Sequence, residues 1–164
     1  MLQRKINILA SITLTAAVLM GTGTASGAAT ELPVSGGQMT VGVLDPGTSW
    51  VDGEGITHVR GLILEVSFSG DIEGNAIQGL NYNIDPFGNG DLHGTAEFEG
   101  TIFGDDAMLS GRFAGDISGG VFSADSIGHG TIAGARAQSR LTTTGVLGSG
   151  VATYDGTILF PQGR

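Results

Sequence analysis

Apolar and polar residues alternate along many segments of this chain, and a period of two is the pattern of a β-strand with one buried face. The clearest segment is 62–68, in which Leu62, Leu64, Val66 and Phe68 share one face. Alternation also indicates strands over residues 39–44, 50–51, 76–84, 92–102, 108–117, 121–127, 135–144 and 151–160. Helical periodicity is not sustained in any window after residue 30. The pattern therefore predicts an all-β domain.

Glycine sharpens this prediction, since it supplies 30 of the 164 residues against a usual share of about 7%. Its spacing is not Gly-X-Y, which excludes collagen, and interleaved apolar residues exclude a flexible linker. Glycine within alternating segments marks bends, bulges and turns. Gly104-Asp105-Asp106 indicates a hairpin, and Gly134 is expected at a turn into a late strand. Many strands separated by such turns predict a single closed antiparallel β-barrel of about eight strands.

The first residues have the three parts of a secretory signal peptide. Arg4 and Lys5 are followed by an apolar run over 6–20 and by small residues over 21–29. The apolar run is shorter than the roughly 20 residues that span a bilayer, so cleavage is expected. The sequence therefore predicts export, to the periplasm or the medium.

Three segments follow from this division of the chain: a signal peptide over 1–29, a flexible lead over 30–37, and a barrel domain over 38–164. The sequence contains no cysteine, so neither a lipid anchor nor a disulfide is expected. Cleavage of the signal peptide removes Arg4 and Lys5 and leaves five basic residues against 16 acidic ones, a formal net charge of −11. Such a charge repels nucleic acid and anionic lipid, so neither nucleic acid nor membrane insertion after cleavage is expected.

Several glycine-containing runs carry a family resemblance. They are Phe68 to Gly74, Phe98 to Thr101, Leu109 to Gly111 and Gly128 to Arg136. With these runs the chain resembles an uncharacterised bacterial family of secreted proteins that shares the allene-oxide-cyclase and dirigent-like barrel. The resemblance implies a closed barrel that keeps its working polar groups and an apolar ligand in the lumen.

A second resemblance leads to the same architecture. The runs 98–104, 111–115 and 120–122 are similar to the closing hairpin of transferrin-binding-protein-like barrels. In those proteins that hairpin lies near the end of the barrel, whereas about 40 residues follow it here. Both resemblances imply an eight-stranded barrel, so the fold prediction does not depend on which family is chosen.

One strand carries candidate chemistry. His93, Glu97 and Glu99 share a face, and residues two apart on a strand are separated by about 6.6–6.8 Å. A carboxylate pair beside a histidine suits acid–base work or a metal ion. A solvated outer barrel face explains the same pattern without any chemistry.

Two other motifs have simpler explanations. Asp85, Asn89 and Asp91 lie in a glycine-rich loop, but their spacing is not that of a calcium-binding EF-hand, and turn chemistry accounts for them. Gly128-His129-Gly130 lacks the strand–helix context of a phosphate-binding loop. The sequence therefore predicts neither a metal site nor a cofactor.

Three classes of function remain open from the sequence. The first is a module that binds a small apolar ligand in the barrel lumen. The second is a structural or surface-interaction protein whose barrel is filled by side chains. The third is an enzyme of the cyclase kind, so enzymatic activity is uncertain and is the less favoured interpretation. A hollow lumen would favour the first or third class, and inward-facing ionisable residues would separate these two.

Overall fold

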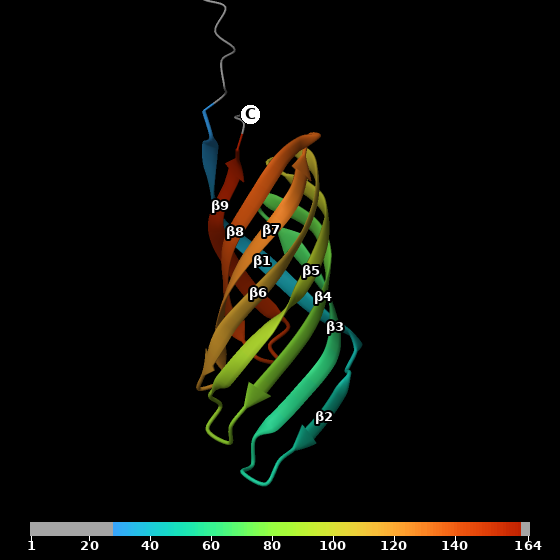
Figure 1. Ribbon diagram of the computed structural model, residues 1–164, viewed down its shortest axis with the longest axis vertical. Coiled ribbons are helices and arrows are strands. Elements are labelled where there is room, and N and C mark those ends of the chain that lie inside the picture. Colours follow the sequence, from blue (N-terminus) through green and yellow to red (C-terminus); the bar gives the residue numbers. More distant parts are fainter. Residues whose placement is uncertain (1–27, 162–164) are drawn as a thin grey trace, which may run out of the picture.

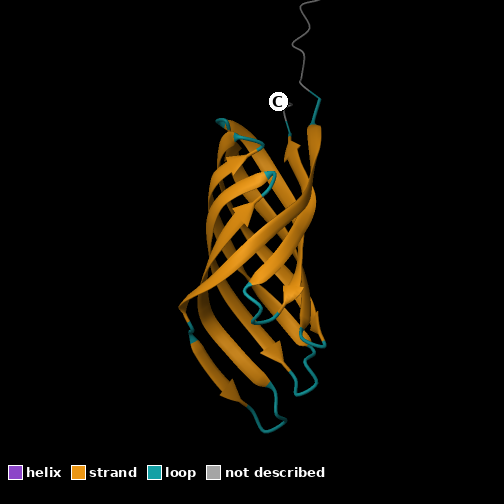
Figure 2. Cartoon of the chain, turned by 180° about the vertical axis from the view of Figure 1, so that it is seen from behind, coloured by secondary structure: helices purple, strands orange, loops and turns teal. Residues whose placement is uncertain are grey.

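The computed structural model describes residues 28–161. Strands make up nearly all of this part of the chain, and it contains no helix long and apolar enough to cross a membrane (Figure 2). The strands are β1 (Thr30–Asp45), β2 (Thr48–Val51), β3 (Thr57–Ser69), β4 (Ile72–Ile84), β5 (Gly90–Ile102), β6 (Asp105–Ser118), β7 (Val121–Ile132), β8 (Ala135–Val146) and β9 (Val151–Phe160).

Eight of these strands close into an antiparallel barrel, which confirms the predicted fold class (Figure 1). From β3 to β9 each strand pairs with the next one in the chain. Strand β1 closes the ring because it pairs with β9 along its first part and with β3 along its second part. The remaining strand, β2, continues past the end of β1 and pairs with β3 outside the ring.

The prediction of a flexible lead over residues 30–37 is wrong, because these residues belong to β1. Residues 30–34 pair with residues 156–160 of β9, and a bulge between Val34 and Gly37 separates this stretch from the rest of β1. Pro33 and the two glycines at the bulge disguise the alternation of a strand that is real. The predicted signal peptide lies, except for Ala28 and Ala29, outside the described residues.

Three of the hairpins have two-residue turns in which both residues have positive φ. This is the geometry of the type I′ turn, whose twist matches that of the flanking strands. The turns are Phe103-Gly104 (53° and 82°), Gly119-Gly120 (57° and 81°) and Ala133-Gly134 (50° and 77°). The first lies one residue before the predicted hairpin, and Gly134 lies at the turn where it was expected.

The barrel interior differs along its length. At the end near the chain termini, large apolar side chains fill the lumen, and Ile102, Ile158 and Phe160 are at most 1% exposed. Farther along, inward positions on neighbouring strands are held by glycine, as in the cross-strand pair Gly111 and Gly128. A Cβ on Gly111 would lie 2.7 Å from the Cα of Gly128. Glycine therefore lets these strands approach closely while adding no side chain to the lumen.

Candidate functional site

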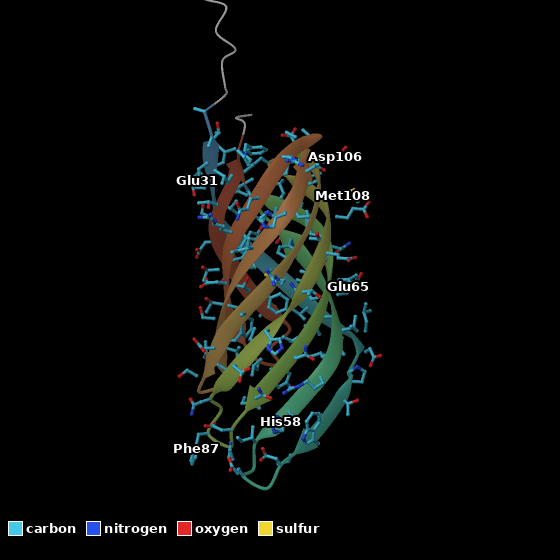
Figure 3. All side chains as sticks on the ribbon, in the orientation of Figure 1. Glu31, His58, Glu65, Phe87, Asp106 and Met108 are labelled. Carbon is cyan, nitrogen blue, oxygen red and sulfur yellow. The ribbon has the colours of Figure 1, made fainter. Side chains whose placement is uncertain are left out.

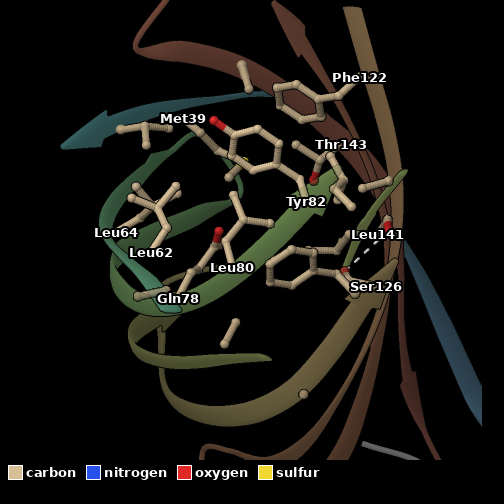
Figure 4. A pocket seen from close by; sticks show the side chains of 18 of the residues that line it. Met39, Leu62, Leu64, Gln78, Leu80, Tyr82, Phe122, Ser126, Leu141 and Thr143 are labelled. Carbon is tan, nitrogen blue, oxygen red and sulfur yellow. Dashed lines mark hydrogen bonds between the residues drawn. The ribbon is translucent and has the colours of Figure 1, made fainter. Parts of the chain in front are cut away.

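The barrel encloses a cavity of about 620 Å³. Small-molecule sites in proteins have volumes of roughly 300–1,000 Å³. The cavity extends from Ile102 and Phe68, deep in the barrel, to Pro46 and Leu147 at the end away from the termini. Its walls come from the inner faces of the barrel strands, and Figure 4 shows part of this lining.

The walls of the cavity are mainly apolar. They follow from the predicted alternation, since every second residue of each strand points inward. The large lining side chains include Met39, Leu62, Leu64, Phe68, Leu80, Leu92, Phe98, Leu109, Phe113, Phe122 and Leu141. Phe68 meets Phe98 edge to face, with ring centroids 5.6 Å apart. An apolar molecule placed here would exchange contact with water for contact with hydrocarbon and aromatic surface.

Tyr154 packs against Phe68 and bonds to Ile72, two residues that line the deep end of the cavity. Its ring meets Phe68 with centroids 5.4 Å apart, and it covers Gly37 so closely that a Cβ on Gly37 would fall within the ring. Its hydroxyl accepts a hydrogen bond from the Ile72 amide at 3.2 Å. It donates toward the carbonyl oxygens of Ser69 and Ile72, which lie 3.0 and 3.1 Å away. Burial raises the pKa of this phenol. Tyr154 thus fastens β9 to the β3–β4 turn.

A few polar groups interrupt the apolar walls. Ser126 donates a hydrogen bond to the Leu141 carbonyl at 3.3 Å (Figure 4). Other lining side chains have polar ends with no hydrogen-bond partner among the described residues; they include Gln78, Tyr82, Ser139 and Thr143. None of their polar atoms is sealed from solvent. These groups can donate to or accept from a ligand without breaking a bond within the protein.

The lining is almost free of charge. Within the described chain it includes no aspartate, glutamate, histidine or lysine. Arg112 contributes to it, but this residue is exposed and lies on the outward side of β6 between two inward-facing neighbours. Tyr82 is the titratable side chain on the inner face of the cavity wall. The cavity therefore has polar groups for recognition but no carboxylate or imidazole for proton transfer.

The predicted candidates His93, Glu97 and Glu99 lie elsewhere. All three are exposed on the outer face of β5, so they share a face as expected but do not reach the cavity. No group of three or more histidines and acidic residues in the described chain is arranged to hold a metal ion. Their placement agrees with the interpretation of a solvated outer face.

The loop that contains Asp85 is organised by turn hydrogen bonds. Oδ1 of Asp85 accepts from the amides of Phe87 and Asn89, both at 2.8 Å. These bonds, led by that to Asn89, lower the pKa of Asp85. Bonds from Gly120 to Gly88 and from Leu147 to Gly120 join this loop to the β6–β7 turn and the β8–β9 loop. The three connections are thus joined to one another, and Leu147 and Gly148 of the β8–β9 loop line the cavity.

Exposed apolar side chains gather at this open end. Most of the large hydrophobic residues that are exposed lie on it, namely Val43, Leu44, Trp50, Val51, Phe87, Val121, Val146 and Val151. Figure 3 shows Phe87 at this end of the molecule and Met108, another exposed apolar residue, at the other. Three of these residues, Val43, Val146 and Val151, also line the cavity, so part of its rim is apolar.

A polar cluster on the outside of the barrel, beside the mouth, was not predicted from the sequence. His58 on β3 contacts Asp52 and Asn83, and Arg60 also reaches Asn83. Trp50 of β2 stacks on His58 with ring centroids 5.0 Å apart. These residues are two to 33 positions apart in the chain, and the pairing of β2 with β3 and of β3 with β4 brings them together. The only sequence signal is the Asp52-Gly53 turn between the segments that contain Trp50 and His58.

Comparison with models of known protein families gave no match, and neither did searches among curated proteins and solved structures. The two family resemblances of the sequence stay predictions. The cavity is therefore the observation on which a functional assignment can be built.

Proposed function

We propose that this protein binds a small, neutral and mainly apolar ligand in the lumen of its barrel. The observation that carries the proposal is the cavity of about 620 Å³, with apolar walls and a few unpaired polar groups. A ligand with a hydrocarbon or aromatic body and one or two hydroxyl or carbonyl groups would match both kinds of surface. Burial of an apolar body contributes about 25 cal/mol for each Å² removed from water.

The hollow interior supports a binding function over that of a structural barrel filled by side chains. The inner wall of the described chain has no carboxylate or imidazole that could transfer a proton, which supports binding over catalysis of the cyclase kind. It also supports a neutral ligand, because a charged group in this cavity would lose its hydration without gaining a partner.

The polarity of the outer surface supports a barrel that is surrounded by water rather than by lipid. Outward positions on β5, such as His93, Glu97 and Glu99, are exposed and polar, whereas inward ones are apolar. A barrel that spans a bilayer has the opposite pattern, with an apolar band outside. We further propose that the protein is exported, as its first 29 residues predict, and that it belongs to the uncharacterised family of secreted bacterial proteins that its glycine-containing runs resemble.

The proposal is tested with a neutral apolar dye, N-phenyl-1-naphthylamine, whose fluorescence increases in apolar surroundings. Ala96 points into the cavity from β5, and Thr95 beside it points outward. The variant Ala96→Phe places a ring in the cavity and is expected to weaken dye binding about tenfold or more, a loss of roughly 1.4 kcal/mol or more.

Thr95→Phe is the matched control, since it adds the same side chain to the same strand on the outer face. It is expected to bind the dye like the unaltered protein. Equal dye affinity in the two variants, with both folded by circular dichroism, would contradict a lumenal site.

A further inference from the structure

Both nitrogens of the His58 imidazole ring meet oxygen atoms. Nε2 is 2.9 Å from Oδ2 of Asp52, in the turn between β2 and β3. Nδ1 is 2.8 Å from Oδ1 of Asn83 on β4. An ionised carboxylate only accepts hydrogen bonds, so Nε2 carries a proton. Whether Nδ1 also donates depends on which way the Asn83 amide is turned.

Two charged neighbours fix the orientation of that amide. Arg60 donates to Oδ1 of Asn83 at 2.6 Å, and Nδ2 of Asn83 lies 3.0 and 3.2 Å from the two carboxylate oxygens of Asp91. The reverse orientation would set the amide nitrogen against the guanidinium and the amide oxygen against the carboxylate. Oδ1 therefore faces His58 as an acceptor. An imidazole that donates from both nitrogens is the charged imidazolium.

This network holds a weakly supported strand. Strand β2 has four residues, all exposed, and in the described chain it pairs with β3 alone. Ser49 of β2 and Thr57 of β3 line the cavity, so β2 forms part of the mouth. On its outer side Trp50 stacks on His58, and the guanidinium of Arg60 lies 5.6 Å from the centre of the Trp50 ring. Loss of the bonds to His58 would therefore loosen one side of the mouth.

We infer that charged His58 is a pH-sensitive clamp that holds β2 at the cavity mouth and slows the exchange of the bound ligand. The inference rests on the proposed function, because the clamp acts on the entrance to that site. Asp52 attracts the imidazolium from the β2–β3 turn, Arg60 repels it from β3, and Asp91 acts from β5 through Asn83.

The direction of the pH effect follows from two pKa shifts. The hydrogen bonds to Asp52 and then Asn83 raise the pKa of His58, against burial and Arg60. The hydrogen bond to His58 is the main cause that lowers the pKa of Asp52. The stabilisation that charged His58 supplies is complete below its unfolded pKa of about 6.5 and is lost as pH rises through its raised pKa in the folded protein. The stabilisation that ionised Asp52 supplies is complete above about pH 4 and is lost as pH falls through its lowered pKa in the folded protein. The clamp is thus strongest between roughly pH 4 and 6.5.

The first test needs no ligand. Nitrogen-15 NMR of His58 in the full chain is expected to show the imidazolium at about pH 6 and its loss above the raised pKa. Trp50 is the only tryptophan of the chain, and a charged imidazolium stacked on an indole quenches its fluorescence. Trp50 emission is therefore expected to rise with pH along the same titration curve as His58.

The second test measures how fast a bound dye leaves the cavity. The dissociation rate of N-phenyl-1-naphthylamine is expected to increase several-fold as pH rises through the pKa of His58. His58→Gln is expected to release the dye quickly at every pH and to abolish the Trp50 titration. His93→Gln is the matched control, because His93 is exposed on β5 and has no hydrogen bond among the described residues. Asp52→Asn, which leaves His58 in place, is expected to lower the pKa of His58.

Neutral His58 at about pH 6, or a Trp50 titration that survives His58→Gln, would overturn the clamp. A dye dissociation rate that stays constant while charged His58 loses its proton would also overturn the clamp. Failure of the dye to bind at any pH would contradict the proposed function instead, and the NMR and Trp50 titrations would still decide whether the clamp exists.

Discussion

Replacement of Tyr154 by phenylalanine removes one buried oxygen atom beside Phe68 and Ile72, which line the deep end of the cavity, and leaves the packed ring in place. That oxygen accepts a hydrogen bond from the Ile72 amide and donates one to the Ser69 carbonyl. Tyr154 and Ile72 are each 2% exposed, so water cannot easily replace the lost partner. An unpaired buried N–H costs about 1–3 kcal/mol, and the lost donation costs about 1 kcal/mol more. The free energy of unfolding is therefore expected to fall by roughly 2–4 kcal/mol.

Tyr82→Phe provides an internal control, because Tyr82 and Tyr154 are the two tyrosines of the chain. The Tyr82 hydroxyl has no hydrogen-bond partner among the described residues, so its removal is expected to change stability by about 0.5 kcal/mol or less. Urea unfolding at neutral pH, followed by circular dichroism, measures both variants. Equal losses, or a larger loss for Tyr82→Phe, would refute the assignment of Tyr154 as the bond that fastens β9 to the β3–β4 turn.

Two further predictions concern backbone and surface positions. Gly134→Val is expected to destabilise the protein by roughly 1–3 kcal/mol through backbone strain, because Gly134 has a φ of +77° with open space around it. Glu97→Gln, on the exposed face of β5, is expected to cost less than about 0.5 kcal/mol in the same denaturation assay. The reverse order would contradict both assignments. Gly37→Ala is expected to cost at least as much as Tyr154→Phe, because its Cβ would displace the Tyr154 ring. The double variant of Gly37→Ala and Tyr154→Phe should then cost less than the sum of the two, and strict additivity would contradict the displacement.

The period of two predicted most of the barrel, because an inward face of apolar residues is written directly in the strand sequence. Leu62, Leu64 and Phe68, which the pattern places on one face, all line the cavity. The face of β5 shared by His93, Glu97 and Glu99 is the outer one. The first half of β1 was missed because Pro33 and the glycines that follow it resemble a strand breaker. Pairing with β9 is what makes this segment a strand, and that pairing is a property of the closed ring rather than of the segment.

The His58 cluster could not be predicted because it depends on register. Residues 58 and 83 are directly opposite on β3 and β4, but a bulge between Val59 and Leu62 shifts the pairing that follows. A register counted back from the well-predicted segment 62–68 would therefore place His58 beside the wrong residue. Histidine and asparagine also carry no periodic signal, since either residue is usual on an exposed strand face.

The cavity could not be predicted from the sequence for a different reason: hydrophobic patterns record large side chains, and the hollow depends on small ones. An eight-stranded barrel is just wide enough for its inward side chains to fill it. Here four consecutive strands place small residues side by side on the inner wall, namely Ala96, Gly111, Gly128 and Ser139. All four line the cavity. The glycines that allow the strands to approach thus also leave the lumen empty, so one compositional feature gives both the fold and the site. This is why a single phenylalanine at position 96 should impair binding while the same ring at position 95 should not.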